Sequence, residues 1–151
     1  MGKFELVFFK GVNWIAKLDP LFKLIQLTSV AQDMDTFIPG RVKRDPRHRF
    51  IAGVIRRLDN HKVVGAIIAV WKLWQEYTAY IPAIWIDRPY RGTKVNGRSL
   101  AELLMRTLFK LLRQDNFFGV VLDVLVNNKR AISFYRKLGF RVYMLSMSRR
   151  L

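Results

Sequence analysis

The sequence predicts an α/β (α+β) fold in which three antiparallel strands precede a helix, a strand, a second helix and a final strand. Two observations indicate this order. The middle of the 151-residue chain consists of short apolar, β-branched runs separated by turn residues, which is typical of antiparallel strands. The last third alternates apolar runs with segments of helical periodicity, which is typical of β-α-β units. No repeat or linker interrupts the chain, so we expect a single domain over residues 1–151.

The N-terminal part predicts short helices. Asp19-Pro20 is a typical helix start, and Pro39-Gly40 is a typical end of a helical region. We therefore expect helices over 20–27 and 29–37. Residues 4–27 mix large apolar side chains with lysines, which fits either a helix and strand packed on the core or a basic interfacial surface.

The middle of the chain predicts three neighbouring strands. Residues 58–62 supply a turn between the first two. Gly65 lies inside the second strand, where a bulge or a close approach of another backbone is expected. The predicted strands are 50–56, 63–71 and 76–86.

The last third predicts two amphipathic helices, each next to an apolar strand. Leucines recur at helical spacing over 97–113, where Asn96 can cap the first turn. Asn127 or Asn128 can cap a second helix that reaches Leu138, and Gly139 fits a helix C-cap. The remaining segments, 117–126 and 140–148, are predicted strands, the first covered on both faces.

Charge and cysteine content narrow the chemistry. The 27 Lys and Arg residues outnumber the 11 Asp and Glu residues and give a net charge of +16. Such a protein attracts anionic partners. The chain has no cysteine, which excludes disulfides and thiolate sites, and we expect no metal site because His48 and His61 lie apart from any ligand cluster. The longest uncharged apolar run, 63–71, is too short to cross a membrane, so we expect no transmembrane segment and a cytoplasmic protein.

The segment from Leu122 to Phe140 carries the clearest motif. It reads L-D-V-L-V-N-N-K-R-A-I-S-F-Y-R-K-L-G-F and resembles the GNAT superfamily of acyl-CoA-dependent N-acyltransferases, whose members show L-x-V, an Asn, an Ala three residues on and F-Y-x-x-x-G-F. The matching residues are Leu122, Val124, Asn128, Ala131, Phe134, Tyr135, Gly139 and Phe140. The resemblance implies a GNAT-like central mixed sheet, with antiparallel N-terminal strands followed by β-α-β-α-β and helices on both faces.

A second segment, 84–100, resembles the strand, pyrophosphate loop and helix of that family. The family loop reads R/Q-x-x-G-x-G/A, whereas here Lys94 and Asn96 occupy glycine positions, and one inserted residue brings Gly97 into register. Either Lys94, Asn96 and Arg98 act as replacement donors, or the loop is remodelled and cofactor binding is weakened or lost. The residues that the resemblance assigns to acetyl-CoA are Ile84, Trp85, Ile86, Arg91, Gly92, Thr93, Lys94, Asn96, Gly97, Arg98, Asn128 and Tyr135.

The resemblance also implies direct attack of an amine on acetyl-CoA. In the family, two parallel strands splay apart around the pantetheine arm. Here these strands are 77–86 and 117–126, with an N–H near Ile86 facing the thioester carbonyl. Tyr135 aligns with the general acid for the departing thiolate, and a core tyrosine would fit the same motif. Asn128 aligns with a polar contact to the cofactor and is equally a helix cap.

The general base is the least specified part of the expected chemistry. Glu76 is the first candidate, because family members often use a strand glutamate, and Asp87 and Tyr80 are the others. Either carboxylate can equally be a solvated charge.

Three functions follow from these observations. We expect an N-acetyltransferase that uses acetyl-CoA and an unidentified, anionic amine acceptor. The alternatives are a catalytically degenerate module that binds RNA, DNA or a ribosome, and an acyltransferase whose donor is acyl carrier protein, an acidic partner. The basic loop 41–49 and the cations of 129–150 would attract any of these anionic partners.

Overall fold

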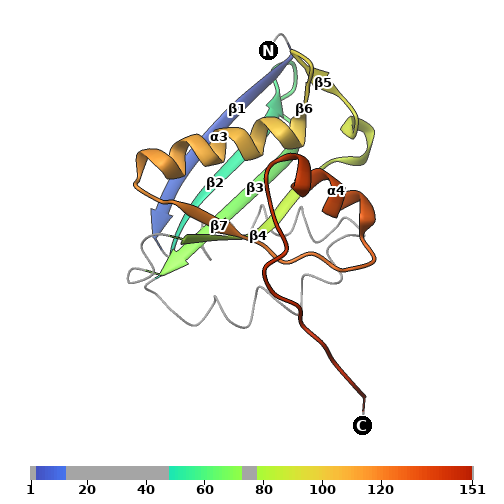
Figure 1. Cartoon of the computed structure of the whole chain (residues 1–151). Coiled ribbons are helices and arrows are strands. Elements are labelled where there is room, and N and C mark those ends of the chain that lie inside the picture. Colours follow the sequence, from blue (N-terminus) through green and yellow to red (C-terminus); the bar gives the residue numbers. More distant parts are fainter. Residues whose placement is uncertain (1–2, 13–47, 73–77, 151) are drawn as a thin grey trace.

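The computed structural model describes residues 3–12, 48–72 and 78–150. In this part of the chain, five strands form one mixed sheet in the order β1-β2-β3-β4-β7 (Figure 1). The strands are β1 (Phe4–Val12), β2 (His48–Arg57), β3 (Val63–Lys72), β4 (Thr78–Ile86) and β7 (Gly119–Val121). The other elements are a 3₁₀ turn (Arg88–Tyr90), a ribbon of β5 (Lys94–Val95) and β6 (Arg98–Ser99), and the helices α3 (Leu100–Gln114) and α4 (Lys129–Lys137).

The three predicted antiparallel strands are confirmed, with a further strand beside them. β1 pairs with β2 along its whole length, β2 with β3, and β3 with β4, all antiparallel. The turn predicted at 58–62 joins β2 to β3, and it is closed by a 2.9 Å bond from the Arg57 N–H to the Lys62 carbonyl. The helices expected over 20–27 and 29–37, and the loop up to residue 47, lie outside the described residues.

Gly65 combines the two features that its position predicts. The register of β2 and β3 shifts next to it, because Ile55 faces Gly65 whereas Arg56 faces Val63. A Cβ at Gly65 would lie 2.8 Å from Ile86 Cδ1. Glycine therefore lets β3 and β4 approach closely at the end of β4.

Pro82 introduces a second irregularity, which the sequence reading did not include. Val70 faces Tyr80 and Ile68 faces Ala83, so two residues of β4 oppose one of β3. Proline has no N–H for a sheet ladder and is found within sheets at bulges. The bulge shifts the alternation of side chains: Ile81 belongs to the core beneath α3, whereas Ala83 and Trp85 are buried outside that core.

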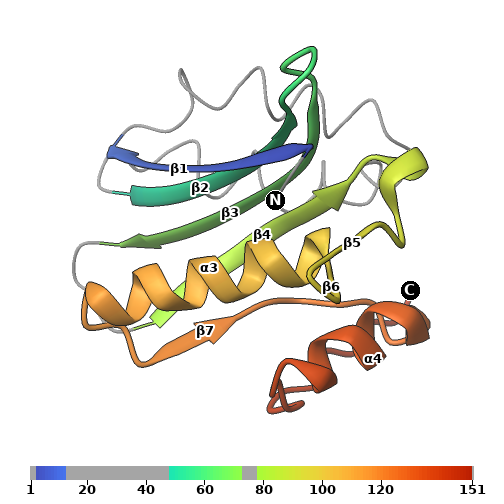
Figure 2. The ribbon, with the colours of Figure 1, turned by 90° about the horizontal axis from the view of Figure 1, so that it is seen from above.

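One face of the sheet is covered by α3 (Figure 2). The buried side chains of the helix recur at helical spacing, and they contact apolar side chains of β2, β3 and β4. The buried residues of α3 are Leu100, Leu104, Met105, Leu108 and Leu112. This helix begins at Leu100 and not at residue 97 as predicted, because Ser99 and not Asn96 caps it: the Ser99 Oγ accepts from the Glu102 N–H at 3.2 Å.

Two predicted strands differ from the structure. The run 117–126 contains only the short strand β7, which pairs in parallel with the first three residues of β4. The strand expected over 140–148 is absent, and residues 141–150 are irregular and exposed. The residues have strand-forming side chains, but a strand also needs hydrogen bonds from a neighbour, and the described part of the chain provides none there. Among the described helices, none is long and apolar enough to cross a membrane.

Candidate active site

A fork between β4 and β7 is the central feature of the candidate site. Pairing between these parallel strands ends at Tyr80 and Val121. β4 continues for six more residues to Ile86, held by β3 on its other side, while the chain after Val121 diverges toward α4 (Figure 2). Backbone groups on the open side of β4, between Ile81 and Ile86, therefore have no strand partner within the described residues.

The segment after β4 folds into a hairpin before α3 begins. Lys94 pairs with Ser99 and Val95 with Arg98, so Asn96 and Gly97 form a two-residue turn. Their φ angles are 50° and 78°, and positive φ at both central residues is the signature of the type I′ hairpin turn favoured by Asn-Gly. Residues 94–99 thus form a hairpin where the family loop has its glycines.

The hairpin changes which backbone groups can meet an anion. Residues 94, 95, 98 and 99 belong to the β5–β6 ribbon, whereas the first turn of α3 starts at Leu100. Because Ser99 satisfies the N–H of Glu102, the amides of Leu100 and Ala101 are the uncapped donors of that turn. The sequence reading missed these two residues, although Ser99 and Glu102 have the S-x-x-E spacing of a capping box.

Four exposed cations lie on the segment that connects β4 to α3. They are Arg88, Arg91, Lys94 and Arg98. Arg91 Nε donates to the Ile86 carbonyl at 3.0 Å, which holds this guanidinium at the end of β4. Arg98 lies 3.9 Å from the Glu102 carboxylate, and the same carboxylate is 2.7 Å from Arg106. Positive charge therefore exceeds negative charge at this end of the sheet.

Contacts from the β2–β3 hairpin fix the loop that carries these cations. The Asp87 N–H donates to the Val64 carbonyl at 2.8 Å, and the Asp87 carboxylate lies 3.0 Å from Lys62 Nζ. Arg57 donates to the Tyr90 hydroxyl at 3.1 Å. Thr93 is held by a bond of 3.1 Å from its N–H to the Tyr90 carbonyl. Asp87 is thus engaged in an ion pair at the far end of β4 from Tyr80.

Tyr135 lies on α4 and is largely buried. Its ring packs against Phe134 and Phe140, with centroids 5.4 and 5.6 Å away. Burial raises the pKa of its phenol above the ordinary value near 10. Within the described residues its hydroxyl has no hydrogen-bond partner, so the packing holds a neutral phenol whose proton is not engaged by another side chain.

The other predicted polar residues have different surroundings. Asn128 is the N-cap of α4, and its side chain accepts from the Ala131 N–H at 3.1 Å, as one of its two predicted roles requires. Glu76 lies outside the described residues. Trp85 is buried, and its Nε1–H has no hydrogen-bond partner in the described part of the chain.

Tyr80 marks the base of the fork. Its hydroxyl donates to Asp123 at 3.0 Å, which joins β4 to the chain just after β7. This bond lies at the last paired position of the two strands. It was not predicted, because nothing in the sequence spacing relates residue 80 to residue 123.

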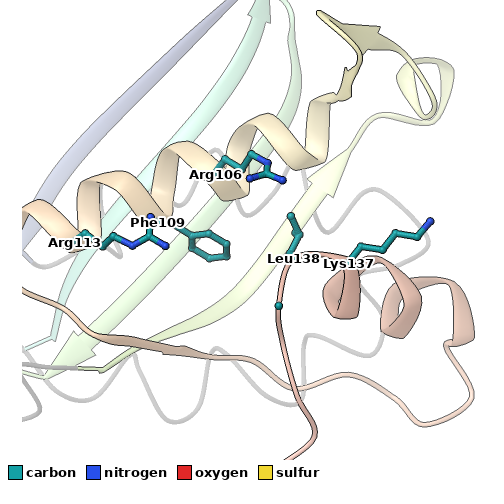
Figure 3. Close-up of a pocket in the computed structure, with 6 residues that line it drawn as sticks. Arg106, Phe109, Arg113, Lys137 and Leu138 are labelled. Atoms are coloured by element: carbon teal, nitrogen blue, oxygen red, sulfur yellow. The ribbon is translucent and has the colours of Figure 1, made fainter.

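A hollow of about 400 Å³ lies elsewhere, between α3 and the end of α4 (Figure 3). It is lined by Arg106, Phe109, Arg113, Lys137, Leu138 and Gly139. These α3 residues belong to the middle and last turns of the helix, away from its N-terminus. The hollow is therefore separate from the fork and from the hairpin loop.

Sequence comparison finds two relationships. The profile of the acetyltransferase (GNAT) family matches residues 17–140. N-alpha-acetyltransferase 30 of Schizosaccharomyces pombe is 30% identical over 100 residues, which are 65% of this chain and 60% of the relative. The chain thus spans about three fifths of the length of the curated relative that it matches.

Structural comparison finds the same fold in solved structures. A Pyrococcus furiosus chain described as an acetyl transferase has a TM-score of 0.66 at 16% identity, over 97% of this chain and 100% of that one. AAC(6')-Iy, in complex with the bisubstrate analogue CoA-S-monomethyl-acetylneamine, has a TM-score of 0.59 at 9% identity, over 97% and 98% of the two chains. At these low sequence identities the structural similarity shows that the chains share a fold, and this confirms the predicted mixed sheet with helices.

Proposed function

Because the chain belongs to the GNAT acetyltransferase family, whose acyl donor is acetyl-CoA, we propose that it transfers an acetyl group from acetyl-CoA to a primary amine. The observation that carries this proposal is the fork. β4 and β7 separate after Tyr80 and Val121, which leaves a row of backbone groups that an extended amide-containing ligand can pair with, as an added strand would.

The chemistry of the fork fits the donor. The pantetheine arm would lie along the open side of β4, between Ile81 and Ile86. The pyrophosphate would meet the amides of Leu100 and Ala101 at the positive end of the α3 dipole. Arg91, Lys94 and Arg98 would add charge, and Asn128 would lie next to the arm at the start of α4.

Tyr135 would supply the proton for the leaving group. Bound acetyl-CoA supplies an activated thioester, and a thiolate departs when the amine nitrogen bonds to the acetyl carbon. A buried phenol is neutral at physiological pH and can give its proton to that sulfur. Burial raises the pKa of Tyr135, and its hydroxyl has no hydrogen-bond partner among the residues that the structure describes; both observations support this role.

The acceptor that fits best is the α-amine of a polypeptide N-terminus. The relative from S. pombe is named an N-alpha-acetyltransferase. An α-amine has a pKa near 8, so a large fraction is neutral at pH 7.5, whereas a lysine with a pKa of about 10.4 is almost entirely charged. An α-amine therefore needs little help from a base. The Tyr80–Asp123 pair at the base of the fork would accept the remaining proton, and Glu76 is a further candidate.

Two peptides of matched length test the acceptor. One has a free N-terminus and no lysine, and the other has a blocked N-terminus and one lysine. Mass spectrometry after incubation with acetyl-CoA should show a gain of one acetyl group on the first peptide and much less on the second. Acetylation of the lysine peptide alone would refute the α-amine assignment but keep the acetyltransferase, and no acetylation of any peptide or small amine would refute both.

The β5–β6 hairpin favours a second candidate, because it replaces the glycine loop of the family. In this alternative the fold binds nucleic acid through exposed cations and has lost catalysis. Retention on RNA that falls steeply with salt, together with no turnover of acetyl-CoA, would support it. Turnover with acyl carrier protein but not with acetyl-CoA would instead identify the donor as that carrier.

A further inference from the structure

We propose that Tyr90 and the turn between β2 and β3 form a brace that positions the cations of residues 87–93 for the pyrophosphate of acetyl-CoA. The inference rests on the proposed function, because it concerns the same donor site. It assigns a positioning role to side chains on β1, on β2 and in the turn, at positions where the family motifs of the sequence analysis have no residue. The side chains of the brace are Phe4, Arg57, Asp59, Lys62 and Tyr90.

The side chain of Tyr90 is held from two strands and a turn. Arg57, at the end of β2, donates to its hydroxyl at 3.1 Å. Phe4, at the start of β1, meets its ring edge-on, with the centroids 6.1 Å apart and 87° between the planes. Lys62 Nζ, from the turn, lies 6.0 Å from the ring centroid, which is within the range of a cation–π contact. Both the ring and the hydroxyl of Tyr90 are therefore fixed.

Arg57 is itself oriented by the turn. Its Nε donates to Asp59 Oδ1 at 2.8 Å, and its Nη2 donates to the other oxygen of the same carboxylate. Two parallel bonds of this kind fix the plane of a guanidinium. The remaining nitrogen, Nη1, is the one that reaches the Tyr90 hydroxyl. Asp59 thus acts on Tyr90 through Arg57.

The main chain of Tyr90 organises the loop that carries the cations. Its N–H donates to the Asp87 carbonyl at 2.9 Å, and its carbonyl accepts from the Thr93 N–H at 3.1 Å. Arg88 lies inside the first of these turns and Arg91 inside the second. A displacement of Tyr90 therefore moves both arginines.

The brace lies at the end of the sheet where the donor site is proposed. Figure 2 shows the β2–β3 turn and the loop after β4 at the end of the sheet where α3 begins. A loop that is ordered only when its ligand arrives loses affinity to the free-energy cost of that ordering, whereas a preformed loop does not. Contacts that hold Tyr90 in the free protein therefore raise the affinity for the pyrophosphate.

Tyr90→Phe tests the brace without changing the charge, and it keeps the ring that packs on Phe4. Calorimetry should show the Kd for acetyl-CoA rising roughly fivefold, as expected for the loss of one hydrogen bond from a charged donor. The kcat/KM with S-acetylpantetheine, which has the thioester but no pyrophosphate, should stay the same. Glu5→Gln is the matched control, because it breaks the neighbouring ion pair of 2.6 Å with Arg56 on the same two strands, and it should leave both quantities unchanged.

Asp59→Ala gives a test in which charge and positioning predict opposite signs. The variant is more positive by one charge, so the field alone would tighten the binding of acetyl-CoA. The brace predicts weaker binding, because Arg57 loses the carboxylate that orients it. If the natural chain binds acetyl-CoA and both variants bind it as tightly, or if Tyr90→Phe loses equally with S-acetylpantetheine, the brace is overturned and the proposed function stands. No binding of acetyl-CoA by the natural chain would overturn both.

Discussion

Tyr135→Phe tests the proposed acid directly, because the structure separates its effect on catalysis from its effect on stability. The hydroxyl has no hydrogen-bond partner among the described residues, so its removal breaks no such bond. The ring contacts with Phe134 and Phe140 remain. We therefore expect the free energy of unfolding to change by less than about 0.5 kcal/mol.

The catalytic effect should be much larger than that. A positioned general acid contributes roughly 100-fold to 10,000-fold to the rate, and 100-fold corresponds to about 2.7 kcal/mol of activation free energy. The single-turnover rate of acetyl transfer should fall by at least 100-fold, while the Kd for acetyl-CoA changes by less than threefold. Rapid mixing of the enzyme with acetyl-CoA and a peptide amine measures the rate of this step, because product release does not limit a single turnover.

Tyr143→Phe is the matched control, because Tyr143 is 72% exposed in the C-terminal segment. It should keep the natural rate. If Tyr135→Phe kept more than a third of that rate, Tyr135 would not be the acid but a core tyrosine, as its packing also allows.

Three further predictions follow from packing, capping and ionisation. Leu104→Ala should lower the free energy of unfolding, measured in urea, by about 2–5 kcal/mol, because Leu104 is fully buried. Leu58→Ala, at an exposed site, should lower it by less than about 0.5 kcal/mol. Equal losses in the two variants would contradict the described core. Ser99→Ala should lower the free energy of unfolding by about 0.5–2 kcal/mol in the same assay, because it removes the cap of α3. Ser99→Asp, which keeps a capping oxygen, should retain most of this stability. Since burial raises the pKa of Tyr135 above the ordinary value near 10, its acid form persists to about pH 10, so the single-turnover rate should fall only above that pH. The free energy of unfolding should also fall there, because the phenol ionises in the unfolded chain at a lower pH than in the folded chain. A fall in rate centred below pH 9 would exclude Tyr135 as the acid.

The parts of the fold with strong periodicity could be predicted from the sequence. The leucine spacing of residues 100–112 fixes the buried face of α3, and the turn at 58–62 lies where the sequence places it. Asn96-Gly97 was misread, because Asn is both a good helix cap and the first residue of a type I′ turn. Ser99 caps the helix that follows, which leaves Asn96-Gly97 to form the turn.

Long-range features could not be predicted in the same way. The Tyr80–Asp123 bond depends on β4 and β7 being neighbours, which no local pattern reveals. The strand expected over 140–148 has suitable side chains, but pairing is decided by a partner elsewhere. The positions of the fork and of Tyr135 followed from the family resemblance, whereas the roles of Tyr135, Asn128 and Glu76 remain predictions.

Calorimetric titration tests whether acetyl-CoA binds at the fork and at the start of α3. We expect acetyl-CoA to bind with a micromolar Kd. Arg98→Glu, beside the first turn of α3, should weaken this binding at least tenfold, whereas Arg149→Glu in the C-terminal segment should not. If no heat of binding appeared at high micromolar acetyl-CoA, or if both variants lost the same affinity, acetyl-CoA would not bind at this site.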